Sequence, residues 1–344
     1  MRERQAWGLI VKRHGNIWDK IVCPENLFRA YKAARRGKGW QRHVKRFERD
    51  VNGNLLRLQK MLCMGEFTTA QYRKKTIYEP KQRDIYVLPF FPDRIVQHAL
   101  LQVIAPIWDA LFIEQSYACR TGRGMHQASQ QTMQHVRRYK YFFKADISKF
   151  YPSINHNILM SIVRRKIKCA RTLGLIENIV RSFDGDKNVP IGNYTSQWFG
   201  NLYMNELDQK IRHEHKIGAY VRYCDDFIVF HNCKKTLSAL KDWIESFLWT
   251  RLELKFSRWS IAPVSHGVDF VGYRHFVGKV LLRKSTARRA QRRMAALLPK
   301  LNACKITVDQ FRSSIASTEG WMKWANTYNL RVSMNLNILK GAIA

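Results

Sequence analysis

Two adjacent carboxylates interrupt one of the most apolar stretches of the sequence, "YVRYCDDFIVF" at residues 220–230. The β-branched and aromatic residues on both sides of the pair favour strands, whereas Asp favours turns. The pattern therefore predicts a β-hairpin with Asp225 at or beside its tip. Asp225 and Asp226 alone indicate little chemistry, because Asp is common in turns for local hydrogen-bonding reasons.

A second apolar strand also ends in an acid, Asp146 in "YKYFFKADISKFYPSI". If both strands lie in one sheet, the three carboxylates converge, and they are stable together only when cations neutralise them. The candidate cations are Mg²⁺, which prefers oxygen ligands, and the side chains of Lys144 or Arg222. Two Mg²⁺ ions held in this way suit nucleotidyl transfer. The sequence favours this metal site over buried salt bridges.

Positive charge dominates the composition, with 60 Lys and Arg against 26 Asp and Glu and a net charge of +34. Solubility needs only about 2 to 8 net charges on a small domain, so the excess predicts a polyanionic partner, with nucleic acid favoured over a membrane surface. No stretch approaches the roughly 18 apolar residues of a membrane span. The N-terminus lacks the pattern of a secretion signal, and the seven cysteines form no Cys-x-x-Cys pair. We expect a cytoplasmic protein with free thiols.

Helix-like and strand-like patterns alternate irregularly, which predicts an α+β fold rather than a doubly wound one. We expect a mixed antiparallel sheet with helices on one face, flanked by helical lobes. Strands are predicted in 76–90, 139–147, 220–230, 254–263 and 268–276, and helices in 24–37, 40–62, 92–106, 155–166, 194–211, 237–247 and beyond 282.

Five motifs resemble those of reverse transcriptases, and along the chain they follow one another in the order found in that family. "YCDD" is similar to their Tyr-x-Asp-Asp box, "ADISKFYPSI" to the first palm motif, "VPIGNYTSQWFGNLYMNELD" to the motif between them, "FVGY" to the primer grip and "YEPKQRDIYVLPFFPDRIVQHAL" to the fingers block. The resemblance implies a right-hand polymerase fold with fingers, a palm built on the antiparallel sheet, and a helical thumb. The implied domains are an N-terminal helical extension with fingers at 1–140, a palm at 141–282 with an interleaved fingers segment at about 157–195, and a basic thumb at 283–344.

The motif around residue 191 points to a subgroup. Many reverse transcriptases carry Gln-Gly-x-x-x-Ser-Pro where this sequence has Ile191, Gly192 and Gln197. This pattern, with "YACRTGRGMH" and "APVSHGVDFVGYR", resembles the reverse transcriptases of diversity-generating retroelements of bacteria and phages. The resemblance implies copying of a template-repeat RNA into cDNA with adenine-directed errors, for mutagenic retrohoming into a target gene. The implied partners are the template RNA, the RNA–cDNA duplex, dNTPs and a small basic accessory variability protein that forms a pentamer.

The resemblance also implies roles for individual residues. Asp146, Asp225 and Asp226 would be the catalytic ligands of two Mg²⁺ ions, for which Mn²⁺ can substitute, with the carbonyl of Ile147 as a further ligand. Tyr151 would lie beneath the nucleotide sugar and exclude ribonucleotides, unless it is an ordinary core aromatic. The residues expected to contact the nucleotide are Lys81, Arg83, Tyr151, Ile191, Gly192, Gln197 and Lys255.

The primer end and the duplex have their own predicted contacts. The primer grip would be formed by Phe270, Gly272 and Tyr273. Arg288 with Arg292, and Arg289 with Arg293, are spaced to lie along one side of a helix and would bind the nucleic-acid backbone. We expect Trp321 and Trp324 to belong to the core of the thumb rather than to stack on bases.

Two alternatives stay open at this point. A group II intron or retron reverse transcriptase would use the same chemistry, although the residues after the thumb leave no room for an appended maturase or Cys/His endonuclease domain. A catalytically silent RNA-binding protein on a polymerase scaffold is the other alternative, and the complete acidic set argues against it.

Overall fold

The computed structural model describes residues 13–78 and 82–335, and it divides into two compact units. Unit 1 comprises the residues up to Glu114, Ile147–Lys216 and Ile244–Ser257. Unit 2 comprises Gln115–Asp146, Ile217–Trp243 and the residues from Arg258 onward. The predicted boundaries of fingers, palm and thumb remain a prediction.

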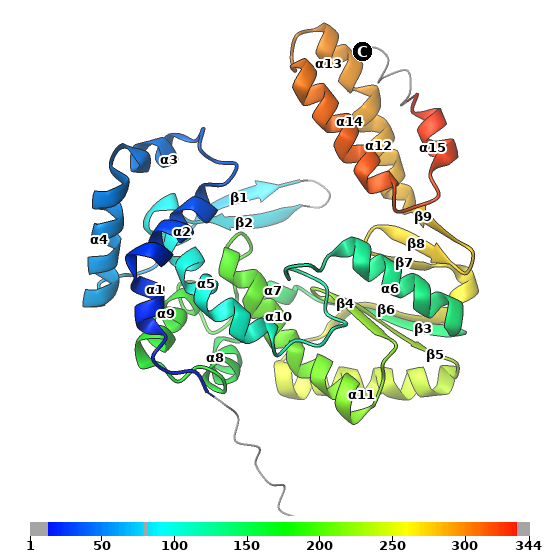
Figure 1. The fold of residues 1–344 in the computed structure, drawn as a ribbon. Helices are drawn as coiled ribbons and strands as arrows, with labels where there is room; N and C mark the ends of the chain where they lie inside the picture. Colours follow the sequence, from blue (N-terminus) through cyan, green and yellow to red (C-terminus); the bar gives the residue numbers. More distant parts are fainter. Residues whose placement is uncertain (1–12, 79–81, 336–344) are drawn as a thin grey trace, which may run out of the picture. The chain divides into compact units, whose positions relative to one another are not determined.

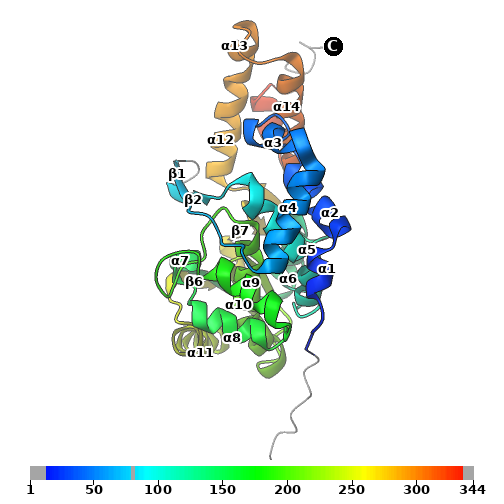
Figure 2. The same cartoon turned by 90° about the vertical axis from the view of Figure 1, so that its left-hand side faces the viewer.

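Five helices form the N-terminal part of unit 1 (Figures 1 and 2). Pro24 lies in the first turn of α2, where its missing N–H costs nothing. Asp50 caps α4 by accepting a hydrogen bond from the Gly53 N–H at 2.9 Å. Leu27 and Leu58 are buried between the helices. The five helices are α1 (Trp18–Val22), α2 (Pro24–Arg35), α3 (Arg42–Phe47), α4 (Val51–Met64) and α5 (Ile95–Asp109).

The rest of unit 1 contains an antiparallel hairpin, four further helices and the C-terminal part of α11 (Lys234–Leu252) from Ile244 onward. The hairpin pairs β1 (Arg73–Ile77) with β2 (Arg83–Val87), as the sequence predicted, and its tip at 79–81 lies outside the described residues. The helices are α7 (Phe150–Ser153), α8 (His156–Arg164), α9 (Ala170–Val180) and α10 (Tyr194–Gln209). Short helical turns connect these elements at η1 (Glu48–Asp50), η2 (Phe90–Arg94) and η3 (Lys210–Glu214).

A four-stranded sheet with the order β4-β5-β3-β6 is the centre of unit 2 (Figure 1). Its strands are β3 (Tyr141–Ile147), β4 (Tyr220–Tyr223), β5 (Asp226–His231) and β6 (Phe256–Pro263), the last of which begins in unit 1. Both the β4–β5 and the β3–β5 pairs are antiparallel. Helix α6 (Met125–Arg138) contacts β4, and helix α11 (Lys234–Leu252) follows β5 in the chain.

Side chains on both faces of this sheet are buried. Phe142 and Phe230 join the core cluster that includes Ala128 and Val136 of α6. Phe143 and Phe227 project to the other face, where their rings lie 6.0 Å apart, and neither is exposed. The prediction of helices on one face is therefore wrong in this respect, because both faces are covered.

The C-terminal part of unit 2 is a small antiparallel sheet followed by four helices (Figure 1). The sheet is formed by β7 (Val268–Phe270), β8 (Tyr273–Phe276) and β9 (Lys279–Leu282), with the turn η4 (Val264–His266) before it. The helices are α12 (Lys284–Ala295), α13 (Leu297–Asn302), α14 (Val308–Met322) and α15 (Tyr328–Ser333). Met294, Phe311 and Ile315 form their core, and Thr307 caps α14 in a capping box with Gln310.

These elements confirm the predicted α+β class, with antiparallel sheets and many helices. Among the helices of the described residues, none combines the length and apolarity that a bilayer crossing requires.

Candidate active site

The hairpin that carries the paired carboxylates forms as predicted. Strands β4 and β5 are joined by a two-residue turn, Cys224 and Asp225, and Tyr223 pairs with Asp226 at its base. Cys224 adopts the left-handed conformation with φ of 56°. The turn places Asp225 at the tip and Asp226 at the first position of β5.

Asp146 is the direct register partner of Asp226 in the antiparallel β3–β5 pair. Residues directly opposite each other in such a pair have Cβ atoms about 4.5–5.5 Å apart. Two acids distant in the sequence therefore meet at the same end of the sheet, with Asp225 next to them. This is the neighbouring arrangement that the two acidic strand ends predicted.

The two basic residues considered as alternative partners behave differently. Lys144 lies two residues before Asp146 and so projects to the same face of β3. Its Nζ lies 3.2 Å from Asp226 Oδ2 and donates a hydrogen bond to the Asp269 carbonyl at 2.6 Å. A salt bridge to Lys144 is therefore present, although the sequence disfavoured it. Arg222 is fully buried and donates a hydrogen bond to the Cys224 carbonyl at 2.9 Å, which helps to fix the conformation of the turn.

Asp226 is short of positive partners despite Lys144. Burial raises the pKa of Asp226 to about 6, the nearby carboxylates of Asp146 and Asp225 add to this rise, and Lys144 opposes it. Its Oδ1 atom is buried without a hydrogen-bond partner. A cation bound at this carboxylate would lower the pKa of Asp226 and give its Oδ1 atom a partner.

These oxygens suit a hard divalent cation. The donors are carboxylates from Asp146, Asp225 and Asp226, and oxygen is the ligand atom that Mg²⁺ prefers. Within residues 13–78 and 82–335, no three His, Cys, Asp or Glu side chains are gathered as a ready metal-ligand set. The unpartnered Oδ1 of Asp226 and the oxygen donors around it suit a cation in type, but Asp146, Asp225 and Asp226 are not gathered as such a set in this structure.

The predicted nucleotide-binding residues around 191 are tied to the hairpin of unit 1. The Tyr86 N–H of β2 donates to the Ile191 carbonyl at 2.7 Å. Gly192 has φ of +119°, and a Cβ at this position would lie 2.5 Å from the Tyr86 carbonyl oxygen. Only glycine fits here, because the backbone of β2 approaches this position so closely.

Tyr151 lies in α7 and is linked to the same segment. Its carbonyl accepts a hydrogen bond from the Val189 N–H at 3.0 Å. Its ring contacts Phe150 at 5.1 Å between centroids, and a Cβ on Gly200 of α10 would lie 3.2 Å from Tyr151 Cε1. Tyr151 is partly exposed, so it is not a fully buried core aromatic.

Three further predicted nucleotide contacts are exposed side chains of unit 1: Arg83, Gln197 and Lys255. Arg83 begins β2, and Gln197 lies in the first turn of α10. The Lys255 ammonium lies 4.2 Å above the ring of Trp249, so it is engaged by an aromatic face here. Lys81 lies outside the described residues.

The predicted primer-grip residues form the β7–β8 turn of unit 2. Phe270 pairs with Tyr273, and both side chains are buried. Gly272 has φ of +86° between them. The Tyr273 hydroxyl donates to the Trp321 carbonyl at 3.1 Å, and the two rings stack at 5.0 Å.

The basic track and the two tryptophans predicted for the thumb agree only in part with the structure. The four arginines of the predicted track are all exposed on α12: Arg288, Arg289, Arg292 and Arg293. Trp321 stacks on Tyr273, and Trp324 is 41% exposed and stacks on His126 at 4.5 Å. Neither belongs to the core cluster of α12–α15, so the prediction of a thumb-core role is wrong.

Comparison with known proteins gives one family. A family model described as "Reverse transcriptase (RNA-dependent DNA polymerase)" matches residues 72–275, more than half of the chain. This region contains both carboxylate-bearing strands and the hairpin of unit 1.

Individual relatives are more distant. Protein YkfC of Escherichia coli is 26% identical over 296 residues, which cover 72% of this chain and 75% of that protein. The group II intron-encoded protein LtrA of Lactococcus lactis is 20% identical over 258 residues, covering 54% of this chain and 43% of LtrA. The chain shares 29% identity over 96 residues with nuclear intron maturase 1 of Arabidopsis thaliana, covering 28% of this chain and 14% of the maturase.

Apo telomerase from Candida tropicalis is a similar solved structure, with a TM-score of 0.46 and 13% identity over 60% of this chain and 47% of the telomerase chain. This chain thus spans less than half of LtrA and of the telomerase chain. The family match covers the motifs that predicted a polymerase fold and its chemistry. The chain therefore belongs to the reverse transcriptase family, and by class it is an RNA-directed DNA polymerase.

Proposed function

We propose that this chain copies an RNA template into cDNA at the sheet end that carries Asp146, Asp225 and Asp226. The observation that supports this most is the pairing of Asp146 with Asp226 across β3 and β5. Reverse transcriptases generally depend on a divalent metal. Bound by these carboxylates and the Ile147 carbonyl, Mg²⁺ would supply activation of the primer 3′-hydroxyl and neutralisation of the leaving pyrophosphate.

The other residues would bind and orient the nucleotide and the primer end. Arg83 and Lys81 offer cations to the triphosphate, and Lys255 offers one to the pyrophosphate once it leaves the Trp249 ring. Tyr151 places a ring where a 2′-hydroxyl would have to fit. Tyr273 and Gly272 shape the turn that positions the primer end.

The template would be a template-repeat RNA, copied with errors at adenines to diversify a target gene. Ile191 supports this subtype, because an apolar side chain at this position cannot form a hydrogen bond that would disfavour a mispaired incoming base. A pentameric accessory variability protein would be the protein partner, and the bacterial cytoplasm the location. The second sequence feature in favour is Gln197, which follows Ser196 where many reverse transcriptases have Pro.

A group II intron-type reverse transcriptase is the second candidate. It is favoured by the relatives, which include LtrA and an intron maturase. A pair of near-identical repeats near the coding sequence, differing mainly at adenines, would support the diversity-generating element. Their absence from the genome, with an intron around the coding sequence, would support the intron enzyme.

Primer extension tests the polymerase proposal. Wild-type protein should extend a DNA primer on an RNA template with dNTPs and Mg²⁺, and Asp225→Asn should bind the same RNA and make no cDNA. Asp242→Asn is the matched control, because its carboxylate is 69% exposed on α11. Synthesis by Asp225→Asn at the wild-type rate would contradict the metal assignment, and inactive wild type would support a silent RNA-binding protein.

Ile191→Gln tests the subtype. The variant should lower misincorporation opposite template adenine roughly ten-fold, because a polar group regained near the base penalises mispairs. Sequencing of extension products measures this. An unchanged error spectrum would show that Ile191 does not cause the misincorporation opposite adenine. It would not affect the polymerase proposal.

A further inference from the structure

The two-residue turn between β4 and β5 lies beside a second segment of unit 2. Ser116 forms a parallel bridge with Arg222, and the Tyr117 N–H donates to the Arg222 carbonyl at 3.0 Å. The Arg222 guanidinium donates a further hydrogen bond to the Ser116 hydroxyl at 2.8 Å. Because the two segments run in the same direction from this bridge, the chain brings Cys119 to the level of Cys224.

The side chains of Cys119 and Cys224 meet at this point. The two thiols form a hydrogen bond with each other, and neither belongs to a disulfide. Both residues are half-buried, and both adopt the left-handed conformation, with φ of 57° and 56°. Glycine or asparagine is the usual residue at such a φ, so the backbone by itself calls for a cysteine at neither position. The pair is therefore a candidate for chemistry that needs two sulfur atoms.

Two thiols in contact can be oxidised to a disulfide by a peroxide. The hydrogen bond from the Cys224 thiol lowers the pKa of Cys119, and the nearby Arg222 cation adds to this effect against the opposing effect of burial. The Cys119 sulfur would attack one oxygen of H₂O₂ and break the O–O bond, which gives a sulfenic acid and a water molecule. The Cys224 sulfur then attacks the Cys119 sulfur, and the hydroxide that leaves takes up the thiol proton as a second water. The two thiols supply both electrons that reduce the peroxide.

A disulfide at this place would change the turn. Two hydrogen-bonded sulfur atoms are still farther apart than the roughly 2.0 Å of an S–S bond, so the two residues must move closer together when it forms. Cys224 directly precedes Asp225, and a turn of two residues can absorb little of this movement. A misplacement of about 1 Å can lower the rate of an enzyme about a hundred-fold. The movement would therefore act on the carboxylate next to the bond.

We propose that Cys119 and Cys224 form a reversible oxidation site, at which a peroxide makes a disulfide that stops cDNA synthesis until a dithiol reduces it. Reduction proceeds through a mixed disulfide, returns both thiols and leaves the dithiol oxidised. Disulfides of cytosolic proteins are usually transient and often sense the redox state. Formation of the bond requires no polymerisation, whereas its effect on synthesis rests on the proposed function.

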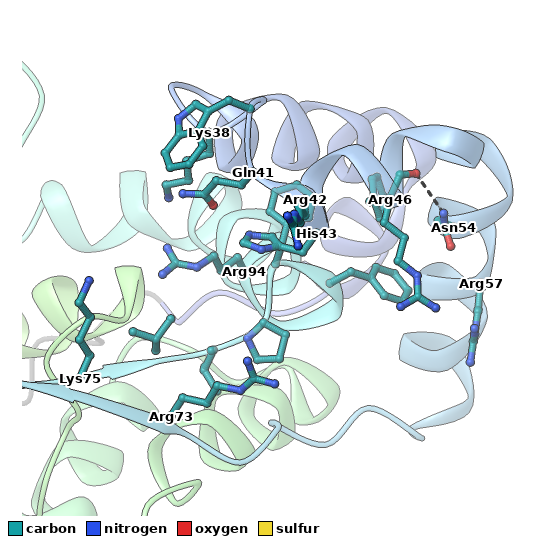
Figure 3. A pocket seen from close by; sticks show the side chains of 17 residues that line it. Lys38, Gln41, Arg42, His43, Arg46, Asn54, Arg57, Arg73, Lys75 and Arg94 are labelled. Carbon is teal, nitrogen blue, oxygen red and sulfur yellow. Dashed lines mark hydrogen bonds between the residues drawn. The ribbon is translucent and has the colours of Figure 1, made fainter. Parts of the chain in front are cut away.

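The basic surfaces of the chain should be unaffected by this bond. Figure 3 shows the large basic hollow of unit 1, where Arg73 and Arg94 are two of the cations, and the lining residues described there include no cysteine. The disulfide alters no basic side chain, so the oxidised protein should keep its affinity for RNA. Retained RNA binding with lost synthesis would therefore assign the effect to the turn.

Peptide mapping detects the bond directly in the full-length protein. The protein is treated with H₂O₂, the remaining thiols are blocked with N-ethylmaleimide, and a tryptic digest is measured by mass spectrometry without reductant. Cys119 is the single cysteine of the tryptic peptide 95–120, whereas Cys224 shares the peptide 223–234 with Cys233. Fragmentation of the linked peptides identifies the bonded sulfur. We expect Cys119 linked to Cys224 in wild type and in Cys233→Ser, and no linked peptides in Cys119→Ser.

Primer extension measures the consequence of the bond. Reduced wild type and reduced Cys119→Ser should extend a primer equally. After peroxide treatment, wild type should lose at least about ten-fold in rate and regain it with dithiothreitol, whereas Cys119→Ser should keep its rate. Cys233→Ser is the matched control, because it removes an exposed thiol and leaves the pair intact, so it should respond like wild type. Fluorescence anisotropy with a labelled RNA should give the same affinity for oxidised and reduced wild type.

Absence of the linked peptides after peroxide treatment would overturn the oxidation site, and so would a link from Cys119 to Cys233 alone. Equal losses of synthesis in wild type and Cys119→Ser would overturn the effect on synthesis, because other thiols would then account for it. The same holds if the oxidised wild type extends primers as fast as the reduced protein. Reduced wild type that makes no cDNA would contradict the proposed function, and the linked peptides would still decide whether the oxidation site exists.

Discussion

Asp226→Asn should stabilise the protein at neutral and alkaline pH, although it removes a salt bridge. Burial raises the pKa of Asp226 from its usual 3.8 to about 6, a shift that already includes the opposing effect of Lys144. Two pKa units correspond to about 3 kcal/mol of differential interaction between the two protonation states. The charged carboxylate is therefore a net cost to the folded state in the absence of divalent metal.

The sign of the pH dependence follows from which state holds the proton. Between about pH 4 and pH 6 the folded state binds this proton more tightly than the unfolded state, so wild-type stability falls as pH rises through this window. Asn resembles the protonated acid and has no such dependence. The variant should match wild type at about pH 4 and exceed its free energy of unfolding by up to about 3 kcal/mol above about pH 6.

Urea denaturation in a chelating buffer, repeated across this pH range, measures the difference. Asp242→Asn should show no comparable pH-dependent gain, because that carboxylate is mostly exposed. Lys144→Met should act in the opposite direction at high pH, because it removes the cation 3.2 Å from Asp226 Oδ2. A difference between wild type and Asp226→Asn that is flat with pH, or a less stable variant at about pH 8, would refute the reasoning.

Two further predictions concern other parts of the candidate site. Tyr151→Ala should raise ribonucleotide incorporation roughly ten- to hundred-fold in primer extension with competing rNTPs. Tyr151→Phe keeps the ring and should not raise it. Unchanged selectivity in the Ala variant would show that Tyr151 does not exclude ribonucleotides. Gly272→Ala should destabilise the protein by about 2 kcal/mol or more, because φ is +86° and the new Cβ would lie 2.5 Å from Trp321 Cη2. Gly278→Ala, with open space around the added Cβ, is its control, and equal thermal midpoints for the two variants would contradict the expected clash.

The carboxylate site could be predicted because strand propensity and polarity conflict there. Nothing in an apolar strand calls for Asp146 or Asp226, so their presence indicates a cost that function must offset. The hairpin and its two-residue turn follow from the same local pattern. The salt bridge to Lys144 could not be settled, because it depends on the register that brings β3 and β5 together.

Other features depend on packing between distant segments. Gly200 reads in the sequence as a minor weakening of a helix, yet a Cβ there would lie 3.0 Å from Phe150 Cε1 and 3.2 Å from Tyr151 Cε1. The sequence predicts a core position for Trp324, but Trp324 stacks on His126 and is 41% exposed.

The interleaving of the two units has a consequence for making and dissecting the protein. Each unit is assembled from three separate stretches, and unit 1 is complete only when residue 257 has been synthesised. During synthesis, the first stretch of unit 1 therefore emerges from the ribosome before the two later stretches that complete its core. Expression of either half by cutting the gene at a single point would give an incomplete core, so fragments should be soluble only when they are produced together and allowed to complement each other.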